Sequence, residues 1–282
     1  MGNARLHSIH IHPVKALRGV PLTEVVVEPW GPAGDRRWML VDDRSRVVTQ
    51  RQQPRLAPTV AELLPGGGVR LSVPGAEPLT VPVPRTGTTV TVEIFGDTVE
   101  ASPVEDPAVR EWCRARFGTG YRLVHLDDPA TRRRIDPAYA GPDDTVTFAD
   151  GYPLLLTTTA SLDALNSLIA VGDHASEGPL PMNRFRPNLV VAGTDAWAED
   201  DWERVAVGEV AFRIAKPCGR CVVTTTDQRT GRRGREPLHS LARHRRDGTK
   251  LLFGQNLIPL TTGTVRTGDP VRVLARRSGR GD

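Results

Sequence analysis

Alternation of apolar and polar residues with a period of two dominates the first hundred residues, and Gly and Pro interrupt it at short intervals. This pattern is typical of short β-strands joined by turns. It occurs in seven segments: 6–15, 22–29, 36–43, 47–52, 69–73, 79–84 and 89–101. Because no helical pattern separates these segments, we expect an antiparallel sheet that closes or nearly closes, forming an N-terminal β-barrel.

The first helical pattern covers residues 106–117. Val109, Trp112, Cys113 and Phe117 recur at helical spacing, so they would lie on one face of an amphipathic helix. We therefore expect Cys113 to be a core residue.

The remainder of the chain mixes helix and strand patterns. A Thr or Ser cap precedes an amphipathic helix within residues 158–170, and a second short helix is predicted within 236–246. Strand patterns occupy 186–193, 203–216, 221–227 and 269–277. The sequence thus predicts a mainly β fold with short helices, of the β/α+β type.

We expect two domains and a short tail. The N-terminal β-barrel domain is predicted to cover residues 1–120, and a second, β-barrel-like domain to cover 121–275. The last segment, 276–282, has no strongly apolar residue and is predicted to be disordered.

Composition excludes several classes of protein. The chain has 282 residues, 39% of them hydrophobic and 25% charged, which is typical of a soluble globular protein, and its net charge is only +4. Aromatic residues make up 5%, fewer than expected for a nucleic-acid binder with interleaved aromatic and basic residues. No apolar run approaches the roughly 20 residues that span a bilayer. With three cysteines and no signal-peptide pattern, we expect a cytoplasmic protein with no nucleic-acid or membrane partner.

Two cysteines, Cys218 and Cys221, stand three residues apart beside a run of threonines. They could form half of a zinc site with His239 and His244, although a separation of five is wider than the usual finger spacing. They could also form a redox dithiol, but such a pair should begin a helix, and the β-branched residues that follow predict a strand. Alternatively, one cysteine could be the lone protein ligand of a metal whose other ligands belong to a cofactor.

Basic and amide side chains recur near predicted strand ends. Arg184, Arg186 and Asn188 would alternate on one face of a strand, and Lys15 and Arg36 lie in loops that end strands. Charge at a sheet edge or on the surface would explain each group alone. Guanidinium groups also bind phosphate through paired hydrogen bonds. Together with a soft sulfur ligand, these basic groups favour a bulky anionic metal cofactor.

Five ordered segments, which cover nearly the whole chain, resemble the MOSC-domain family. They are IHPVKALRG through TQRQQPRLA, FADGYPLLLTTTASLDALN, NRFRPNLVVAG through VGEVAF, KPCGRCVVTTTDQRTG, and LFGQNLIPL through VRVL. The first resembles the N-terminal β-barrel of the family and the others resemble the MOSC domain. The resemblance is greatest to the mitochondrial amidoxime-reducing components and their bacterial counterparts.

The resemblance implies a molybdenum cofactor at the interface of the two domains, with Cys221, not Cys218, as the thiolate ligand of the metal and the catalytic residue. Ala16 departs from the serine that commonly follows the motif lysine, so one hydroxyl donor is missing, and the side chains of the 150–152 turn also differ from those of some relatives. The residues implied to bind the pterin and its phosphate are Lys15, Arg36, Asp150, Gly151, Tyr152, Arg186, Asn188 and Arg220.

The resemblance also implies an activity, the reductive removal of oxygen from N-hydroxylated compounds such as amidoximes, hydroxylamines and N-hydroxylated bases. Some bacterial relatives carry a C-terminal ferredoxin domain, and this chain does not, so electrons are expected from a separate ferredoxin-, flavoprotein- or cytochrome-type protein. An alternative is a sulfur-carrier protein that handles the cofactor through a cysteine persulfide, because MOSC domains also form the C-terminus of cofactor sulfurases.

Overall fold

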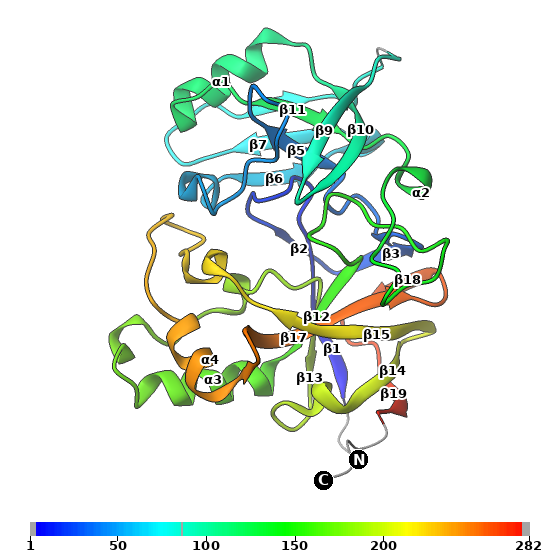
Figure 1. Cartoon of the computed structure of the whole chain (residues 1–282), viewed down its shortest axis with the longest axis vertical. Coiled ribbons are helices and arrows are strands. Elements are labelled where there is room, and N and C mark those ends of the chain that lie inside the picture. The colour runs from blue at the N-terminus through cyan, green and yellow to red at the C-terminus, as the bar shows by residue number, and fades with distance from the viewer. Residues whose placement is uncertain (1–3, 86, 278–282) are drawn as a thin grey trace.

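Strands dominate the computed structural model, which describes residues 4–85 and 87–277, and the mainly β fold with short helices is confirmed (Figure 1). Figure 1 shows two halves, with α1 and β5 to β11 in the upper half and most of the later strands in the lower half. The α-helices of the described residues are α1 (Pro107–Phe117), α2 (Pro129–Arg132), α3 (Thr159–Ala170) and α4 (Leu238–His244).

The largest sheet occupies the lower half and has nine strands, in the order β19-β14-β15-β17-β12-β13-β1-β2, with β16 paired to β17. One pair of neighbours, β12 and β13, is parallel. Parallel neighbours need a long crossover, and α3 lies within this one. The strands are β1 (Arg5–Ile11), β2 (Val20–Leu22), β12 (Leu154–Thr158), β13 (Leu189–Ala192), β14 (Trp202–Val207), β15 (Val210–Gly219), β16 (Arg246–Asp247), β17 (Lys250–Pro259) and β19 (Val271–Arg276).

Three smaller sheets complete the structure. The first has the order β5-β11-β10-β9, the second β6-β7-β8 and the third β18-β3-β4. Their strands are β3 (Glu24–Glu28), β4 (Gly31–Pro32), β5 (Trp38–Val41), β6 (Val60–Leu63), β7 (Val69–Ser72), β8 (Leu79–Val81), β9 (Val90–Ile94), β10 (Asp97–Pro103), β11 (Arg122–His125) and β18 (Gly263–Arg266). The first two sheets contain most of the segments predicted to form the N-terminal barrel.

Strand pairing crosses residue 120 in both directions. The N-terminal β1 pairs with β13, and β3 pairs with β18, whereas β11, which follows residue 120, pairs with β5 and β10. The division into 1–120 and 121–275 stays a prediction, and this pairing joins the two parts through continuous sheets. Of the predicted tail, residues 278–282 lie outside the described residues, and Arg276 ends β19.

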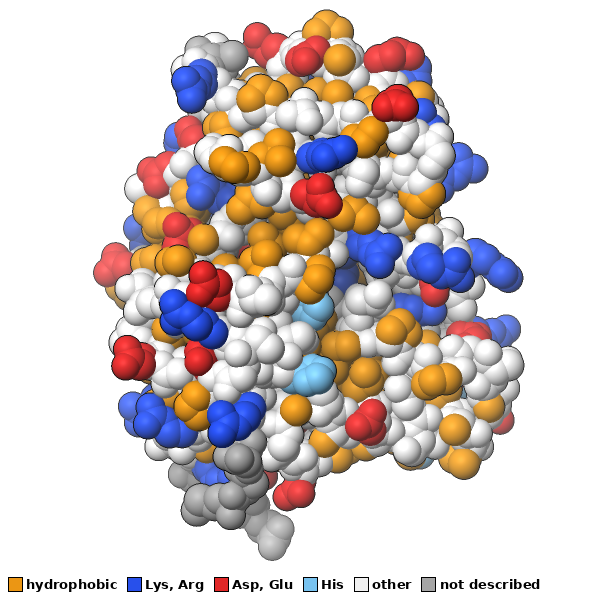
Figure 2. All heavy atoms as spheres, turned by 180° about the vertical axis from the view of Figure 1, so that it is seen from behind, with side chains coloured by type: hydrophobic (Ala, Val, Ile, Leu, Met, Phe, Trp, Pro, Cys, Tyr) orange, Lys and Arg blue, Asp and Glu red, His pale blue; other side chains and the backbone are white. Residues whose placement is uncertain are grey.

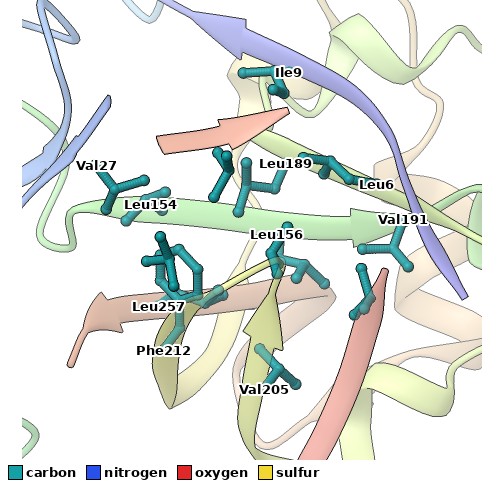
Figure 3. Close-up of a cluster of buried hydrophobic side chains, with 14 of the residues drawn as sticks. Leu6, Ile9, Val27, Leu154, Leu156, Leu189, Val191, Val205, Phe212 and Leu257 are labelled. Carbon is teal, nitrogen blue, oxygen red and sulfur yellow. The ribbon is translucent and has the colours of Figure 1, made fainter. Parts of the chain in front are cut away.

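The core of the large sheet follows from alternation in its strands. Leu154 and Leu156 of β12 and Leu189 and Val191 of β13 face the same cluster, because residues two apart point to the same side of a strand. Figure 3 shows these side chains packed with residues from neighbouring strands, among them Leu6, Ile9, Val205, Phe212 and Leu257. A fully buried side chain of this size stabilises the fold by about 1.5–3 kcal/mol, and this cluster fixes β1 against the C-terminal strands.

The three predicted helices are present. The side chain of Asp106 caps α1 by accepting a hydrogen bond from the Ala108 backbone N–H, and Cys113 is fully buried in the upper core, as expected. Thr158 caps α3 through the Ser161 N–H. The third helix, α4, occupies the middle of the predicted segment 236–246.

Two predicted strands, 221–227 and 47–52, are wrong, as is the alternation predicted for Arg184, Arg186 and Asn188, and all three segments lie beside the cleft described below. Residues 221–227 form the 3₁₀-helix η6 (Val222–Thr225), in which the hydroxyls of Thr224 and Thr225 bond backbone carbonyls three residues earlier. Such local bonds compete with strand pairing. The strand predicted over 186–193 is present as β13, but it begins only at Leu189. The residues before it form η4 (Met182–Arg184) and a positive φ at Arg186, so the alternation predicted for Arg184, Arg186 and Asn188 does not occur. Residues 47–52 form a turn after a single bridge of Val47 to Val41.

Candidate active site

A cleft lies where the two halves meet, and it encloses about 870 Å³ of space between protein atoms, its open mouth included. Loops after β1 and β5, the β9–β10 turn, the loop before β12, the bend before β13 and the end of β15 all contribute side chains. The structure brings all nine predicted site residues to this cleft: Lys15, Arg36, Asp150, Gly151, Tyr152, Arg186, Asn188, Arg220 and Cys221. Their roles stay predictions, but their convergence does not depend on the resemblance.

Lys15 and Asp150 form an ion pair in the cleft, with 2.5 Å between the Lys15 Nζ and the Asp150 Oδ1. The ammonium also donates to the Phe148 carbonyl at 2.8 Å. The Lys15 side chain is 5% exposed, and burial lowers its pKa to about 8, although Asp150 opposes that shift. Lys15 is therefore charged at neutral pH but loses its proton just above it, and a second anion beside it would stabilise the charged form.

Arg36 is held by a buried carboxylate and an amide. Its Nη1 donates to the Asp35 Oδ2 at 2.5 Å and to the Asn188 Oδ1 at 2.9 Å. Asn188 is fixed in turn, because its Oδ1 accepts from the Leu155 N–H and its Nδ2 donates to the His10 carbonyl. Asn188 thus orients Arg36 and joins β1, β12 and β13 at one point.

Arg186 lies just before β13 and lines the cleft, where its side chain is partly buried. Burial, together with the charge of Arg36, lowers its pKa to about 9. Within the described part of the chain, its side chain donates one hydrogen bond, from Nη1 to the Oε1 of Gln228 at 3.3 Å. A partly buried guanidinium that donates to a neutral amide indicates a site for an anionic group.

Backbone strain is concentrated around the cleft. Among the described residues, six other than glycine have positive φ, and four of them line the cleft: Ala16, Arg36, Phe95 and Arg186. L-residues rarely adopt this conformation, and it persists where the surrounding structure enforces it, often at functional sites.

The two cysteines line the cleft in different surroundings. Cys221 lies just before η6, and the Nη2 of Arg51 is 3.7 Å from its sulfur. Cys218 lies on β15, and its sulfur accepts from the Nη1 of Arg220 at 2.9 Å. Arg220 also donates to the Phe185 carbonyl, while its Nε is buried without a partner.

Sequence reasoning missed several residues of the cleft. Arg51, Gln50 and Thr49 lie in the segment that was predicted to be a strand, and Phe95 occupies the β9–β10 turn. The segment TQRQ belonged to the first block of the resemblance, which could have drawn attention to Gln50 and Arg51. No pattern in the sequence singled out Phe95, because its position depends on how the hairpin packs against the distant loop before β12.

The charge balance of the cleft fits an anionic metal cofactor. Among the described residues, five cationic side chains line it, from Lys15, Arg36, Arg51, Arg186 and Arg220, against a single carboxylate, Asp150. Within residues 4–85 and 87–277, no group of three or more His, Cys, Asp or Glu side chains is arranged to hold a metal ion. His239, one of the residues considered for a zinc site with the cysteines, contacts Asp173 at 3.2 Å.

Comparisons with known proteins agree with this geometry. Residues 3–120 match the MOSC N-terminal beta barrel domain, and residues 143–272 match the MOSC domain. The chain therefore belongs to the MOSC-domain family, as the resemblance in sequence implied, with the N-terminal barrel followed by the MOSC domain.

Among its relatives is the mitochondrial amidoxime-reducing component 1 of Homo sapiens, 32% identical over 285 residues that cover 94% of this chain and 82% of the relative. The protein of the same name from Xenopus laevis is 31% identical, covering 95% of this chain and 81% of the relative. The molybdenum cofactor sulfurase of Oryza sativa subsp. japonica is 28% identical over 90% of this chain, but this match covers 32% of that much longer protein.

A second cavity of about 580 Å³ shares Arg186 with the cleft and is lined also by His10, His12, Arg18 and Gln228. Burial holds the pKa of His12 well below its usual value, so this ring stays neutral. Figure 2 shows histidine side chains beside a hollow on the face opposite to that of Figure 1, with Lys and Arg gathered at mid-height.

Within the described part of the chain, no helix is both long and apolar enough to cross a bilayer.

Proposed function

We propose that this protein is a molybdenum-cofactor enzyme that reduces N-hydroxylated compounds. The observation that carries the proposal is the convergence of five cationic side chains and the Cys221 sulfur on one cleft. Similarity to proteins named amidoxime-reducing components supports the choice of reaction. When bound, the cofactor would supply the two-electron chemistry by which an N–OH group, two electrons and two protons become N–H and water.

Different residues of the cleft would bind different parts of the cofactor. Lys15, a buried cation, and Arg186, a partly buried one, would bind the phosphate and the polar edge of the pterin. The guanidinium of Arg36 is fixed in its orientation by hydrogen bonds to Asp35 and Asn188. Cys221 would be the thiolate ligand, with Arg51 stabilising its negative charge from 3.7 Å.

The Asp150–Tyr152 turn and Arg220 complete the proposed contacts. Asp150 keeps Lys15 in place through their ion pair. The ring of Tyr152 lies beside the ammonium of Lys216, 5.0 Å from Nζ to the centre of the ring. Arg220 is tied to Cys218 and to the Phe185 carbonyl, so it extends along the wall next to Cys221.

Electrons would come from a separate ferredoxin-, flavoprotein- or cytochrome-type protein, and the substrate is a small N-hydroxylated molecule. The test uses protein purified with its cofactor, a chemical reductant and benzamidoxime, with benzamidine quantified by chromatography. We expect benzamidine to form with wild-type protein and with Cys218→Ala, and not with Cys221→Ala. No turnover of any compound in a panel of amidoximes and hydroxylamines would refute the proposal.

A second candidate is a sulfur carrier that uses a cysteine persulfide. It is favoured by one observation, the thiol of Cys218 at 2.9 Å from Arg220 in the same cleft, which would stabilise a negatively charged sulfur. Intact-protein mass spectrometry separates the two candidates. Molybdenum with pterin supports the enzyme, whereas protein with an adduct of about 32 Da, one sulfur atom on a reactive thiolate, supports the carrier.

A further inference from the structure

Phe95 occupies an unfavourable position for a phenylalanine. It is the first of the two turn residues between β9 and β10, with φ of 54°, and Gly96 follows with φ of 96°. Turns with two positive φ values favour Asn, Asp or Gly at the first position, and a bulky side chain there is strained. Phe95 is 43% exposed and belongs to none of the hydrophobic clusters of the described residues. Packing in the core therefore does not explain the residue.

The turn is fixed against the cleft from its other side. Asp97, which follows the turn, accepts from the Nε of Arg133 at 2.9 Å. The same buried guanidinium donates to three carbonyls of the loop before β12, which lines the cleft. These carbonyls belong to Thr147, Ala149 and Asp150. Arg133 thus connects the β9–β10 turn to the loop that holds Lys15, and it keeps Phe95 at the cleft in spite of the strain.

The ring lies at the Cys221 end of the cleft. The Cζ of Arg51 is 4.7 Å from the centre of the Phe95 ring, and the Nη2 of the same side chain is 3.7 Å from the Cys221 sulfur. The Nζ of Lys15 is 4.8 Å from the ring centre. One arginine side chain therefore separates an exposed aromatic ring from the proposed metal ligand, and part of the ring surface stays open at the mouth of the cleft.

From this geometry we infer that Phe95 is a specificity-determining residue, which stacks on substrates that carry a flat aromatic ring close to the N–OH group. The inference rests on the proposed function and names the substrate class within it. Aromatic rings attract one another in offset or edge-to-face arrangements, beyond the area that they bury. An aliphatic hydroxylamine has no ring to place there, so it gains nothing from Phe95.

The test compares wild-type protein with Phe95→Leu, which keeps apolar bulk but removes the ring, and with Phe95→Tyr, which keeps the ring. The substrates are benzamidoxime and N-methylhydroxylamine, reduced by the holoenzyme with a chemical electron donor. We expect Phe95→Leu to raise KM for benzamidoxime about 3- to 10-fold, the range of one aromatic pair, with kcat nearly unchanged. KM for N-methylhydroxylamine should stay within about twofold, and Phe95→Tyr should retain the wild-type values.

A second measurement does not depend on turnover. Isothermal titration calorimetry with benzamidine should show weaker binding to Phe95→Leu than to wild type by a similar factor, and no change for the remote exposed control Leu274→Ala. Equal benzamidine affinity in wild type and Phe95→Leu, or equal KM changes for both substrates, would overturn the inference. Failure of the wild type to reduce either substrate would instead refute the proposed function, and the calorimetry would still decide whether Phe95 recognises an aromatic ring.

Discussion

Replacing Arg133 with methionine tests whether one buried guanidinium holds the cleft together. The Arg133 side chain is 5% exposed and its partner Asp97 is 52% exposed. The contact to Asp97 is therefore screened by water and contributes at most about 1 kcal/mol. The larger loss comes from the carbonyls, which lie at 3.2, 2.5 and 3.2 Å from the guanidinium nitrogens and belong to Thr147, Ala149 and Asp150.

Methionine fills a similar volume and donates no hydrogen bond, so the variant leaves these carbonyls without their partner. A hydrogen bond to a charged group contributes about 1.5–3 kcal/mol, and not every carbonyl will find water. We expect the free energy of unfolding to fall by about 3–5 kcal/mol. For a chain of 282 residues, unfolding entropy of about 2.1 cal/mol/K per residue converts this loss to a fall in Tm of about 5–8 °C.

Differential scanning calorimetry or thermal denaturation followed by circular dichroism measures the effect. The matched control is Asp97→Asn, which keeps an acceptor for Arg133 and removes only the exposed charge, and it should change the free energy of unfolding by less than about 1 kcal/mol. A Tm of Arg133→Met within about 2 °C of wild type would refute the reasoning, as would an equal loss in both variants.

Three further predictions follow from the site and the core. Because burial lowers the pKa of Lys15 to about 8, this side chain loses its charge as pH rises through 8. The affinity of cofactor-free protein for pyrophosphate, measured by titration calorimetry, should therefore fall about fourfold between pH 7 and 8.5. The affinity of Lys15→Arg should not change over this pH range. Phe212→Ala, at a fully buried position, should lower the free energy of unfolding by about 3–5 kcal/mol, measured in urea, and a loss below 1 kcal/mol would contradict the packing described. Gly254→Ala should also destabilise, since φ is 78° and an added Cβ would lie 2.7 Å from the Leu156 carbonyl oxygen; an unchanged urea midpoint would contradict this.

The sequence predicted the elements whose signals are local. The apolar spacing of 106–117 was sufficient for α1, because helical periodicity depends on neighbours within a few residues. Alternation likewise predicted β14 and β15. Pairing of β1 with β13 could not be predicted, since it joins segments about 180 residues apart.

The strand predicted over 221–227 failed for a different reason. Val222 to Thr226 are β-branched and favour strands, but Thr224 and Thr225 use their hydroxyls to satisfy carbonyls of their own segment and form a 3₁₀ turn. This turn directs Cys221 into the cleft. Arg51 and Phe95 were missed because their positions depend on contacts with distant segments, to Cys221 and to the loop that Arg133 holds.

The central claim is that Cys221, and not Cys218, holds molybdenum in this cleft. The most direct test is elemental analysis of wild-type protein, Cys218→Ala and Cys221→Ala, each produced with the cofactor available. X-ray absorption on the same samples counts the sulfur ligands of the metal. The account predicts molybdenum near one atom per chain in wild type and Cys218→Ala, and either its loss or one fewer sulfur ligand in Cys221→Ala. The same metal content and the same sulfur count in both variants, or zinc bound by the two cysteines together, would contradict it.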